Sequence, residues 1–170
     1  MSIDEYDDGR TWYDTAQICL NGHSVNQSSK SSPEFSSSFC RKCGAPTITS
    51  CPACKGEIRG YLHMPNVFGF GEDEIPAHCH ACGKPYPWTE ERIKAARELT
   101  DELEGLTAEE KQQLKQSIDD IVADTPRTSL AATRFKRLAA KAGRVAAEGF
   151  KEILIGVLSE TAKKMIYPGP

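Results

Sequence analysis

Seven cysteines and one histidine form four short-range pairs in the first half of the 170-residue chain. Three pairs follow the pattern Cys-x-x-Cys, and in the fourth a histidine follows a cysteine after three residues. The pairs are Cys19 with His23, Cys40 with Cys43, Cys51 with Cys54, and Cys79 with Cys82. Thiolate and imidazole ligands favour tetrahedral zinc. Two tetrahedra need eight ligands, which these residues supply, so the spacing predicts two structural Zn²⁺ ions.

Small turn-forming residues follow the cysteine pairs. Gly44 and Gly83 come directly after Cys43 and Cys82, and the pair Lys55-Gly56 follows Cys54. Such turns bring two sulfurs together, while the backbone N–H groups that follow stabilise the thiolates. One Cys-x-x-Cys would be weak evidence, but four closely spaced pairs are strong evidence for metal binding.

Spacing leaves open which pairs share a metal. Sequential pairing joins the first two pairs at one ion and the last two at the other, and we favour it by analogy with tandem zinc ribbons. Nested pairing would join the two middle pairs and bring the outer two together. Crossed pairing would alternate them.

Other interpretations of these residues explain the pattern less well. Cysteines packed in an apolar core would not fall into regular pairs, and no βαβ setting for a thioredoxin-type redox site is visible. Iron could replace zinc at an all-cysteine site. His23 could be a surface histidine, but one tetrahedron would then lack a protein ligand. We interpret His63, His78 and His80 as surface residues or neighbours of the metal, because they show no regular spacing.

The expected sites are structural. Four protein ligands leave no open position for water or substrate, and every cysteine is used as a ligand. The chain shows no Walker loop, no H-E-x-x-H, no G-x-S-x-G and no G-x-G-x-x-G motif. We therefore do not expect an enzyme.

The elements that must hold these ligands are short. Residues 1–18 are expected to form a partly ordered lead-in, and residues 19–88 a double zinc-ribbon domain, with strands predicted near 47–49 and 57–62. Serine-rich 28–38 and glycine-containing 65–76 are expected to be loops. About 70 residues with short strands cannot bury a large core, so metal would replace it.

Helical periodicity characterises residues 89–170, which we expect to form a helical domain. Thr89 is a candidate cap for a helix over 90–104, and Thr107 begins a capping-box pattern for a helix over 107–123. From Thr128 an apolar stripe continues to Ile166, as one bent helix or two. The expected fold class is therefore small metal-stabilised zinc ribbons with short β-hairpins, followed by an α-helical region.

Four segments resemble an uncharacterised bacterial family known only as a domain of unknown function. They are Ile18-Cys19-Leu20-Asn21-Gly22-His23, Phe39-Cys40-Arg41-Lys42-Cys43-Gly44, the stretch from Cys79 to Thr89, and Ser159-Glu160-Thr161-Ala162-Lys163-Lys164. The resemblance spans most of the chain. It implies an N-terminal double zinc ribbon, a helical C-terminal part and a bacterial source, and no established activity.

Charge is unevenly distributed in the helical part. Residues 89–124 hold 5 basic and 11 acidic residues, whereas residues 125–151 hold 7 basic residues and one acid. The basic segment could pack on the acidic helices, bind an acidic protein, or contact phosphates. We expect an interaction or adaptor protein that meets a protein partner or a second copy through its C-terminal helices. The alternative is a nucleic-acid-binding regulator that uses the basic helix 127–151.

The expected location is the cytosol. Residues 1–10 are acidic and lack the apolar stretch of a signal peptide, and the longest apolar run, 153–158, is too short to span a membrane. An odd number of cysteines argues against a disulfide framework.

Overall fold

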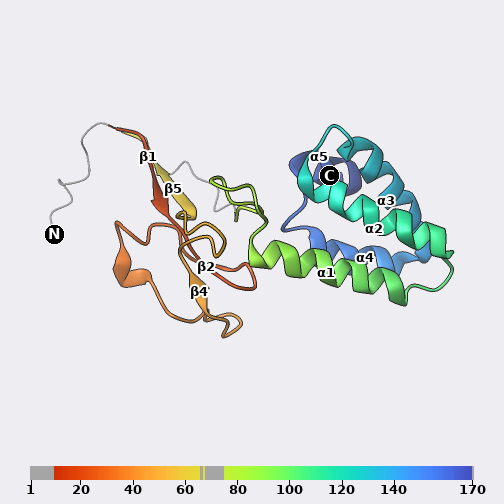
Figure 1. The fold of residues 1–170 in the computed structure, drawn as a ribbon, viewed down its shortest axis with the longest axis horizontal. Coiled ribbons are helices and arrows are strands. Elements are labelled where there is room, and N and C mark those ends of the chain that lie inside the picture. Colours follow the sequence, from red (N-terminus) through yellow and green to blue (C-terminus); the bar gives the residue numbers. More distant parts are fainter. Residues whose placement is uncertain (1–9, 66, 68–74, 170) are drawn as a thin grey trace. The chain divides into compact units, whose positions relative to one another are not determined.

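A computed structural model describes residues 10–65, 67 and 75–169 of the chain. The chain divides into two compact units, Met1–Trp88 and Thr89–Pro170. The first unit contains short antiparallel strands joined by long loops, and the second is helical (Figure 1). This arrangement confirms the predicted fold class of small ribbons followed by helices.

Where the structure describes it, the first unit contains two small antiparallel sheets. One has the order β1-β5, and the other has the order β3-β2-β4. The central strand β2 ends at Cys19, so this sheet delivers the first candidate ligand. The strands are β1 (Trp12–Thr15), β2 (Gln17–Cys19), β3 (Ser24–Asn26), β4 (Thr47–Ile48) and β5 (Arg59–His63). The serine-rich loop contains a short 3-10 helix, η2 (Pro33–Phe35), and most of the expected loop 65–76 lies outside the described residues.

The apolar core formed by the described residues of the first unit is small. Ile18, Ile58, Tyr86 and Trp88 are at most 2% exposed. The rings of Tyr86 and Trp88 stack with centroids 4.6 Å apart, and Trp88 Nε1 donates a 2.9 Å hydrogen bond to the carbonyl of Pro76. A core of this size is typical of domains that need a metal or another cross-link for stability.

A buried carboxylate adds a polar anchor to this unit. Asp14 accepts hydrogen bonds from the backbone N–H groups of Thr15 (2.6 Å) and Lys30 (3.0 Å) and from the Ser31 hydroxyl (2.5 Å). Burial opposes the charged carboxylate, but these donors and His63 together lower the pKa of Asp14 below its ordinary value. The ionised side chain thereby ties the loop at 30–31 to strand β1.

Five helices follow among the described residues, and the first of them begins at the end of the first unit. They are α1 (Pro87–Glu102), α2 (Ala108–Ala123), α3 (Thr128–Ala142), α4 (Arg144–Leu154) and α5 (Glu160–Ile166). The predicted capping box is confirmed, because the Thr107 hydroxyl accepts from the Glu110 N–H and the Glu110 carboxylate accepts from the Thr107 N–H. The predicted cap at Thr89 is wrong. Pro87 occupies the first helical position, where its missing N–H costs nothing, and Thr89 lies inside α1.

Residues 128–166 form three helices rather than one or two. The first break is at Gly143, whose φ of 109° is accessible to glycine but not to most residues. The second break follows Leu154, and Ser159 then caps α5 by accepting from the Ala162 N–H at 3.2 Å. Periodicity alone could not show these breaks, because the apolar spacing continues through both of them.

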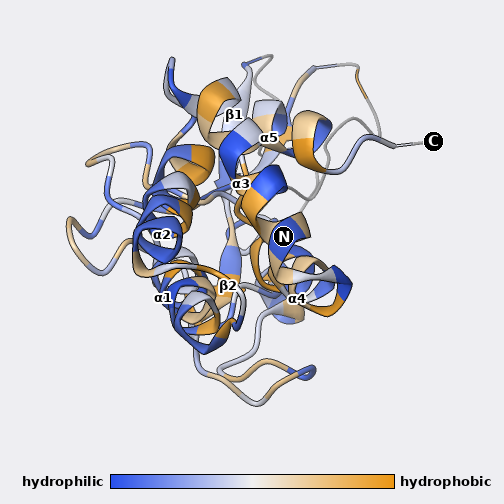
Figure 2. Cartoon of the chain, turned by 90° about the vertical axis from the view of Figure 1, so that its right-hand side faces the viewer, coloured by the Kyte–Doolittle hydropathy of each residue, from blue (hydrophilic) through white to orange (hydrophobic). Residues whose placement is uncertain are grey.

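The core of the helical unit lies around α3. Phe135 of α3 and Phe150 of α4 are buried and meet edge to face, with ring centroids 5.3 Å apart. Each helix alternates between hydrophilic and hydrophobic residues along its turns (Figure 2). Most of the apolar stripe is therefore buried within this unit, because its helices fold back on each other. The buried members are Ala131, Phe135, Leu138, Ala139, Ala146, Phe150, Leu154, Val157, Leu158, Ala162 and Ile166.

Candidate metal centres

The three Cys-x-x-Cys segments adopt one repeated backbone turn. In each, the residue directly after the second cysteine donates a backbone hydrogen bond to the carbonyl of the first cysteine. The donors are Gly44 at 2.7 Å, Lys55 at 2.9 Å and Gly83 at 2.8 Å. These three residues have positive φ angles of 73°, 64° and 73°. Glycine adopts this left-handed conformation freely, whereas Lys55 adopts it against its intrinsic preference.

A tighter loop carries the fourth pair. The Gly22 N–H donates to the carbonyl of Cys19 at 2.8 Å, and the Cys19 N–H donates to the carbonyl of His23 at 3.0 Å. Gly22 has a φ of 79°, and a Cβ there would lie 2.9 Å from Cβ of Trp88. A glycine is required at this position for both reasons. The loop turns His23 back toward the sulfur of Cys19.

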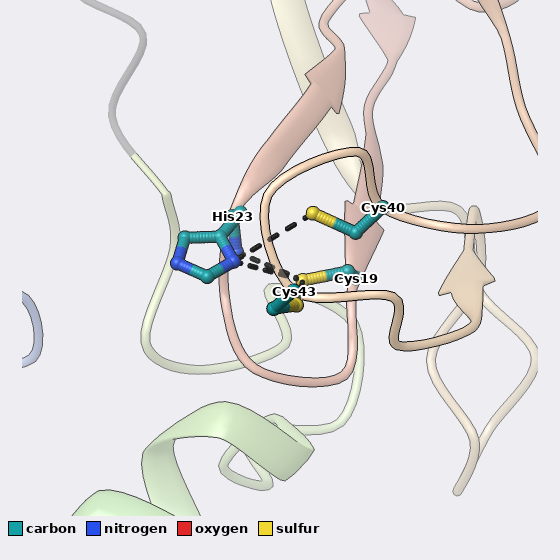
Figure 3. A group of neighbouring side chains, drawn as sticks. All are labelled: Cys19, His23, Cys40 and Cys43. Carbon is teal, nitrogen blue, oxygen red and sulfur yellow. Dashed lines mark hydrogen bonds between the residues drawn. The ribbon is translucent and has the colours of Figure 1, made fainter.

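The first cluster combines Cys19, His23, Cys40 and Cys43. Figure 3 shows the His23 ring facing the sulfurs with its Nδ1 atom. Nδ1 lies 3.5 Å from the sulfur of Cys19 and 3.7 Å from that of Cys40, and the sulfurs of Cys19 and Cys43 are 3.7 Å apart. His23 therefore presents a ring nitrogen at the fourth corner of a group of three sulfurs.

The second cluster combines Cys51, Cys54, Cys79 and Cys82. The sulfurs of Cys51 and Cys82 are 3.9 Å apart, and those of Cys54 and Cys79 are 3.7 Å apart. Both contacts join cysteines from different turns, so the two turns face each other. All eight predicted ligands thus fall into two groups that follow the sequential pairing, and neither nested nor crossed pairing occurs.

The spacing of these atoms fits tetrahedral zinc. Zn–S bonds of about 2.3 Å give a tetrahedron with S···S edges of about 3.8 Å, and a Zn–N bond of about 2.0–2.1 Å gives an S···N edge of about 3.6 Å. Three sulfur pairs lie 3.7–3.9 Å apart and two sulfur–nitrogen pairs 3.5–3.7 Å apart, and all donor atoms of each group lie within 4.8 Å of one another. A disulfide would need sulfurs about 2.05 Å apart. The donor sets could therefore hold metal ions, and they are too widely spaced for disulfide bonds.

Without a cation, four neighbouring sulfurs cannot all be ionised. Burial opposes the thiolate of Cys79, but the N–H groups of Ala81 and Cys82 and the surrounding thiols lower its pKa to about 6. At Cys54 the N–H of Gly56 favours the thiolate, but burial and the neighbouring sulfurs raise its pKa to about 11. One thiolate thus suppresses ionisation of another, and a divalent cation would relieve this repulsion.

Further donors stabilise negative charge on the sulfurs of the first cluster. The His23 N–H donates to the Cys19 sulfur at 3.2 Å, and the Asn21 side-chain amide donates to the Cys43 sulfur at 3.4 Å. Asn21 was not predicted from the sequence, although its position in a turn just before Gly22 is typical of asparagine.

A buried tyrosine contributes to the second cluster. Burial and a hydrogen bond to Cys79 raise the pKa of Tyr86, so its hydroxyl stays protonated beside that sulfur. Nothing in its sequence pattern distinguishes Tyr86 from an ordinary core aromatic residue.

The remaining histidines lie outside both donor groups. His63 is stacked on Trp12 with ring centroids 4.2 Å apart, and its Nε2 atom lies 3.3 Å from Oδ2 of Asp14. His78 forms an isolated bridge with Pro85, and His80 is exposed. In the part of the chain that the structure describes, these three residues belong to no candidate metal group.

Each candidate centre has a buried and an exposed side. Cys19 and Cys40 are buried in the first cluster, as are Cys51 and Cys79 in the second, whereas Cys43, Cys54 and Cys82 are exposed. With four protein donors each, filled centres would have no position for a substrate. Their exposed edges would still allow a chelator to compete for the metal.

Comparison with known proteins shows the family of the chain. A family model described as "Uncharacterized protein conserved in bacteria (DUF2321)" matches residues 12–166. No curated protein and no solved structure matches the chain. Among the described residues, no helix is long and apolar enough to cross a membrane.

Proposed function

We propose that this chain, which belongs to that family of uncharacterised bacterial proteins, is a zinc-binding interaction protein rather than an enzyme. In this proposal two structural Zn²⁺ ions hold the ribbon unit as a rigid platform, and the helical unit docks a protein partner. The observation that carries it is the agreement between the donor spacing in both clusters and the edges of a zinc tetrahedron.

The proposal assigns the zinc ions a structural role. The described residues of the first unit include few large buried apolar side chains, so closing two loops of chain with metal would supply stability that this core does not. All seven cysteines would serve as ligands, which leaves no thiol as a nucleophile. Thiolate–zinc centres suit a reducing compartment, and we accordingly propose the cytosol.

Nucleic-acid binding is the second candidate function. It is favoured by Arg134, Lys136 and Arg137 of α3, which have no carboxylate within ion-pair distance among the described residues. Other cations near α3 are neutralised internally, since Lys141 pairs with Glu110 at 2.6 Å and Arg127 with Asp120 at 3.7 Å. The ribbon segment 1–88 has 7 basic and 10 acidic residues, and bound thiolates would add negative charge. This acidity favours a protein partner over phosphates.

Two measurements test the proposal. Native mass spectrometry of freshly reduced protein should show two zinc ions per chain, and one or none would contradict the metal assignment.

The tagged chain should then be expressed in its source bacterium, chemically cross-linked in the cell and purified, with and without nuclease. A protein that co-purifies after nuclease treatment, and binds again when both components are purified, supports the docking role. Recovery of nucleic acid alone would favour the second function.

A further inference from the structure

The unpaired cations of α3 stand between two surface hollows. We define the basic ridge as Thr133, Arg134, Lys136 and Arg137. One hollow, of about 550 Å³, lies between α2 and α3 and is lined by Gln113, Gln116, Leu130, Thr133, Arg134 and Arg137. The other, of about 450 Å³, lies between α3 and α5 and is lined by Ala132, Thr133, Lys136, Arg137, Ala140 and Met165. Thr133 and Arg137 line both hollows, so the two form one continuous surface.

The charge on this ridge is available to a ligand. Arg137 is attracted electrostatically by the Glu110 carboxylate. That carboxylate already accepts hydrogen bonds of 2.6 and 2.8 Å from the Lys141 ammonium. Hydrogen bonding by Lys141 is the main reason that the pKa of Glu110 is lowered, with Arg137 adding a weaker attraction. Arg134 and Lys136 have no ion-pair partner among the residues described. An anionic ligand could therefore approach without displacing an existing salt bridge.

The hollows also present apolar and neutral polar groups. Leu130, on the α2 side, is 49% exposed, and Met165, on the α5 side, is 37% exposed. Gln113 and Gln116 add side-chain amides that can donate to and accept from a peptide backbone. Both volumes fall in the range of about 300–1,000 Å³ that is typical of pockets for small ligands and side chains, well above the size of one phosphate.

We propose that the basic ridge binds an acidic segment of a partner protein that carries apolar side chains. Its carboxylates would meet Arg134, Lys136 and Arg137, and its apolar side chains would cover Leu130 and Met165. This inference rests on the proposed docking function and names the chemistry of the partner.

The lining residues favour this partner over nucleic acid. Single strands are held by stacking of bases on aromatic side chains, and neither hollow is lined by an aromatic residue. Duplex binding draws on many cations at once, whereas the ridge offers three cations without an ion-pair partner among the described residues. Exposed leucine and methionine side chains also gain more from apolar partner side chains than from phosphates.

The test uses a fluorescent 15-residue peptide that alternates glutamate with leucine, measured by fluorescence anisotropy against the full zinc-loaded chain. Two control peptides replace every glutamate by glutamine or every leucine by serine. We expect saturable binding of the first peptide and weaker binding of both controls. Arg137→Gln should weaken binding about tenfold, as expected for loss of a charge-assisted contact. Leu130→Ser should weaken it by a smaller factor.

Arg144→Gln is the matched control variant. Arg144 begins α4, its side chain is 90% exposed, and it lines neither hollow. The proposal is overturned if the acidic peptide does not saturate, or if Arg144→Gln weakens binding as much as Arg137→Gln. It is also overturned if a 20-nucleotide oligothymidine or a duplex binds more tightly and depends on Arg137. Metal content is measured on the same samples. If the peptide does not bind to protein that holds two zinc ions and still binds its purified partner, only the ridge proposal is rejected. If peptide binding, zinc and partner binding are all absent, the proposed function is rejected.

Discussion

Each of the two turns of the second cluster contains one residue in the left-handed backbone conformation. Substitutions at these two positions test whether the turns control zinc affinity. Gly83 occupies this position in one turn and Lys55 in the other, with φ angles of 73° and 64°. A non-glycine residue pays about 1–2 kcal/mol in this conformation, while glycine loses roughly 0.5–1 kcal/mol of extra chain freedom on folding. The difference favours glycine by about 1 kcal/mol.

This balance predicts opposite effects of two substitutions. Lys55→Gly should tighten zinc at the second cluster by about fivefold, and Gly83→Ala should weaken it by about the same factor, because folding of the turn and metal binding are coupled. Among the described residues other than its two chain neighbours, none comes within 4 Å of the position that a Cβ would take at Gly83, so that change acts through the backbone alone. Lys55→Ala is the control for charge, because it removes the ammonium and keeps the strained conformation.

The assay is stepwise transfer of zinc to a chelator of known affinity, with amide NMR spectra assigning each step to its cluster. The first cluster serves as the internal reference, since Gly44 and Gly22 are unchanged in every variant. The reasoning is refuted if Lys55→Gly and Lys55→Ala bind zinc equally and Gly83→Ala has no effect. Equal changes at both clusters would also refute it, because the strain is local to one turn.

Three further predictions concern the two units separately. His23→Ala should lose one zinc ion and keep the other, measured by native mass spectrometry, and retention of both at full affinity would remove His23 from the ligand set. Chelation should abolish the amide NMR dispersion of the ribbon unit and spare most helical circular dichroism, because the helical unit buries its own core; complete loss of helix would contradict this. Phe150→Ala should cost the helical unit about 3–5 kcal/mol of unfolding free energy in urea denaturation, since Phe150 is fully buried against Phe135, and metal content should not change.

The ligand groups could be predicted because their geometry is encoded locally. A cysteine pair with a following glycine specifies its own turn, and Gly44 and Gly83 have the left-handed angles that such turns require. The choice among pairings could not be made in this way. It depends on β2 lying between β3 and β4, which places Cys19 beside the loop that carries Cys40. Asn21 and Tyr86 escaped prediction because their contacts with sulfur arise only after the turns have met.

The helices show a similar division between local and tertiary information. The capping box at Thr107 is complete within four residues, so the sequence predicts it correctly. The sequence left open one bent helix or two over 128–166, and the second break, after Leu154, was not predicted, because an apolar stripe with helical spacing is compatible with one long helix or with shorter helices that fold together. Burial of Phe150 against Phe135 favours the second arrangement here. Most of the stripe therefore lies inside the helical unit and does not by itself form an exposed face for a second copy.

The two units should consequently respond to zinc in different ways. Removing the metal would leave four sulfurs within a few ångströms in the second cluster, with pKa values driven apart to about 6 at Cys79 and about 11 at Cys54, and three sulfurs beside the His23 ring in the first. The small core of the ribbon unit offers little to hold such a cluster closed. The basic ridge, by contrast, is supported by Phe135, Leu138 and Ala139 on the buried face of the same helix. Loss of zinc would then unfold the ribbon unit and leave the basic ridge folded. A partner that requires both surfaces would be released on metal loss, whereas an acidic peptide would stay bound to the ridge.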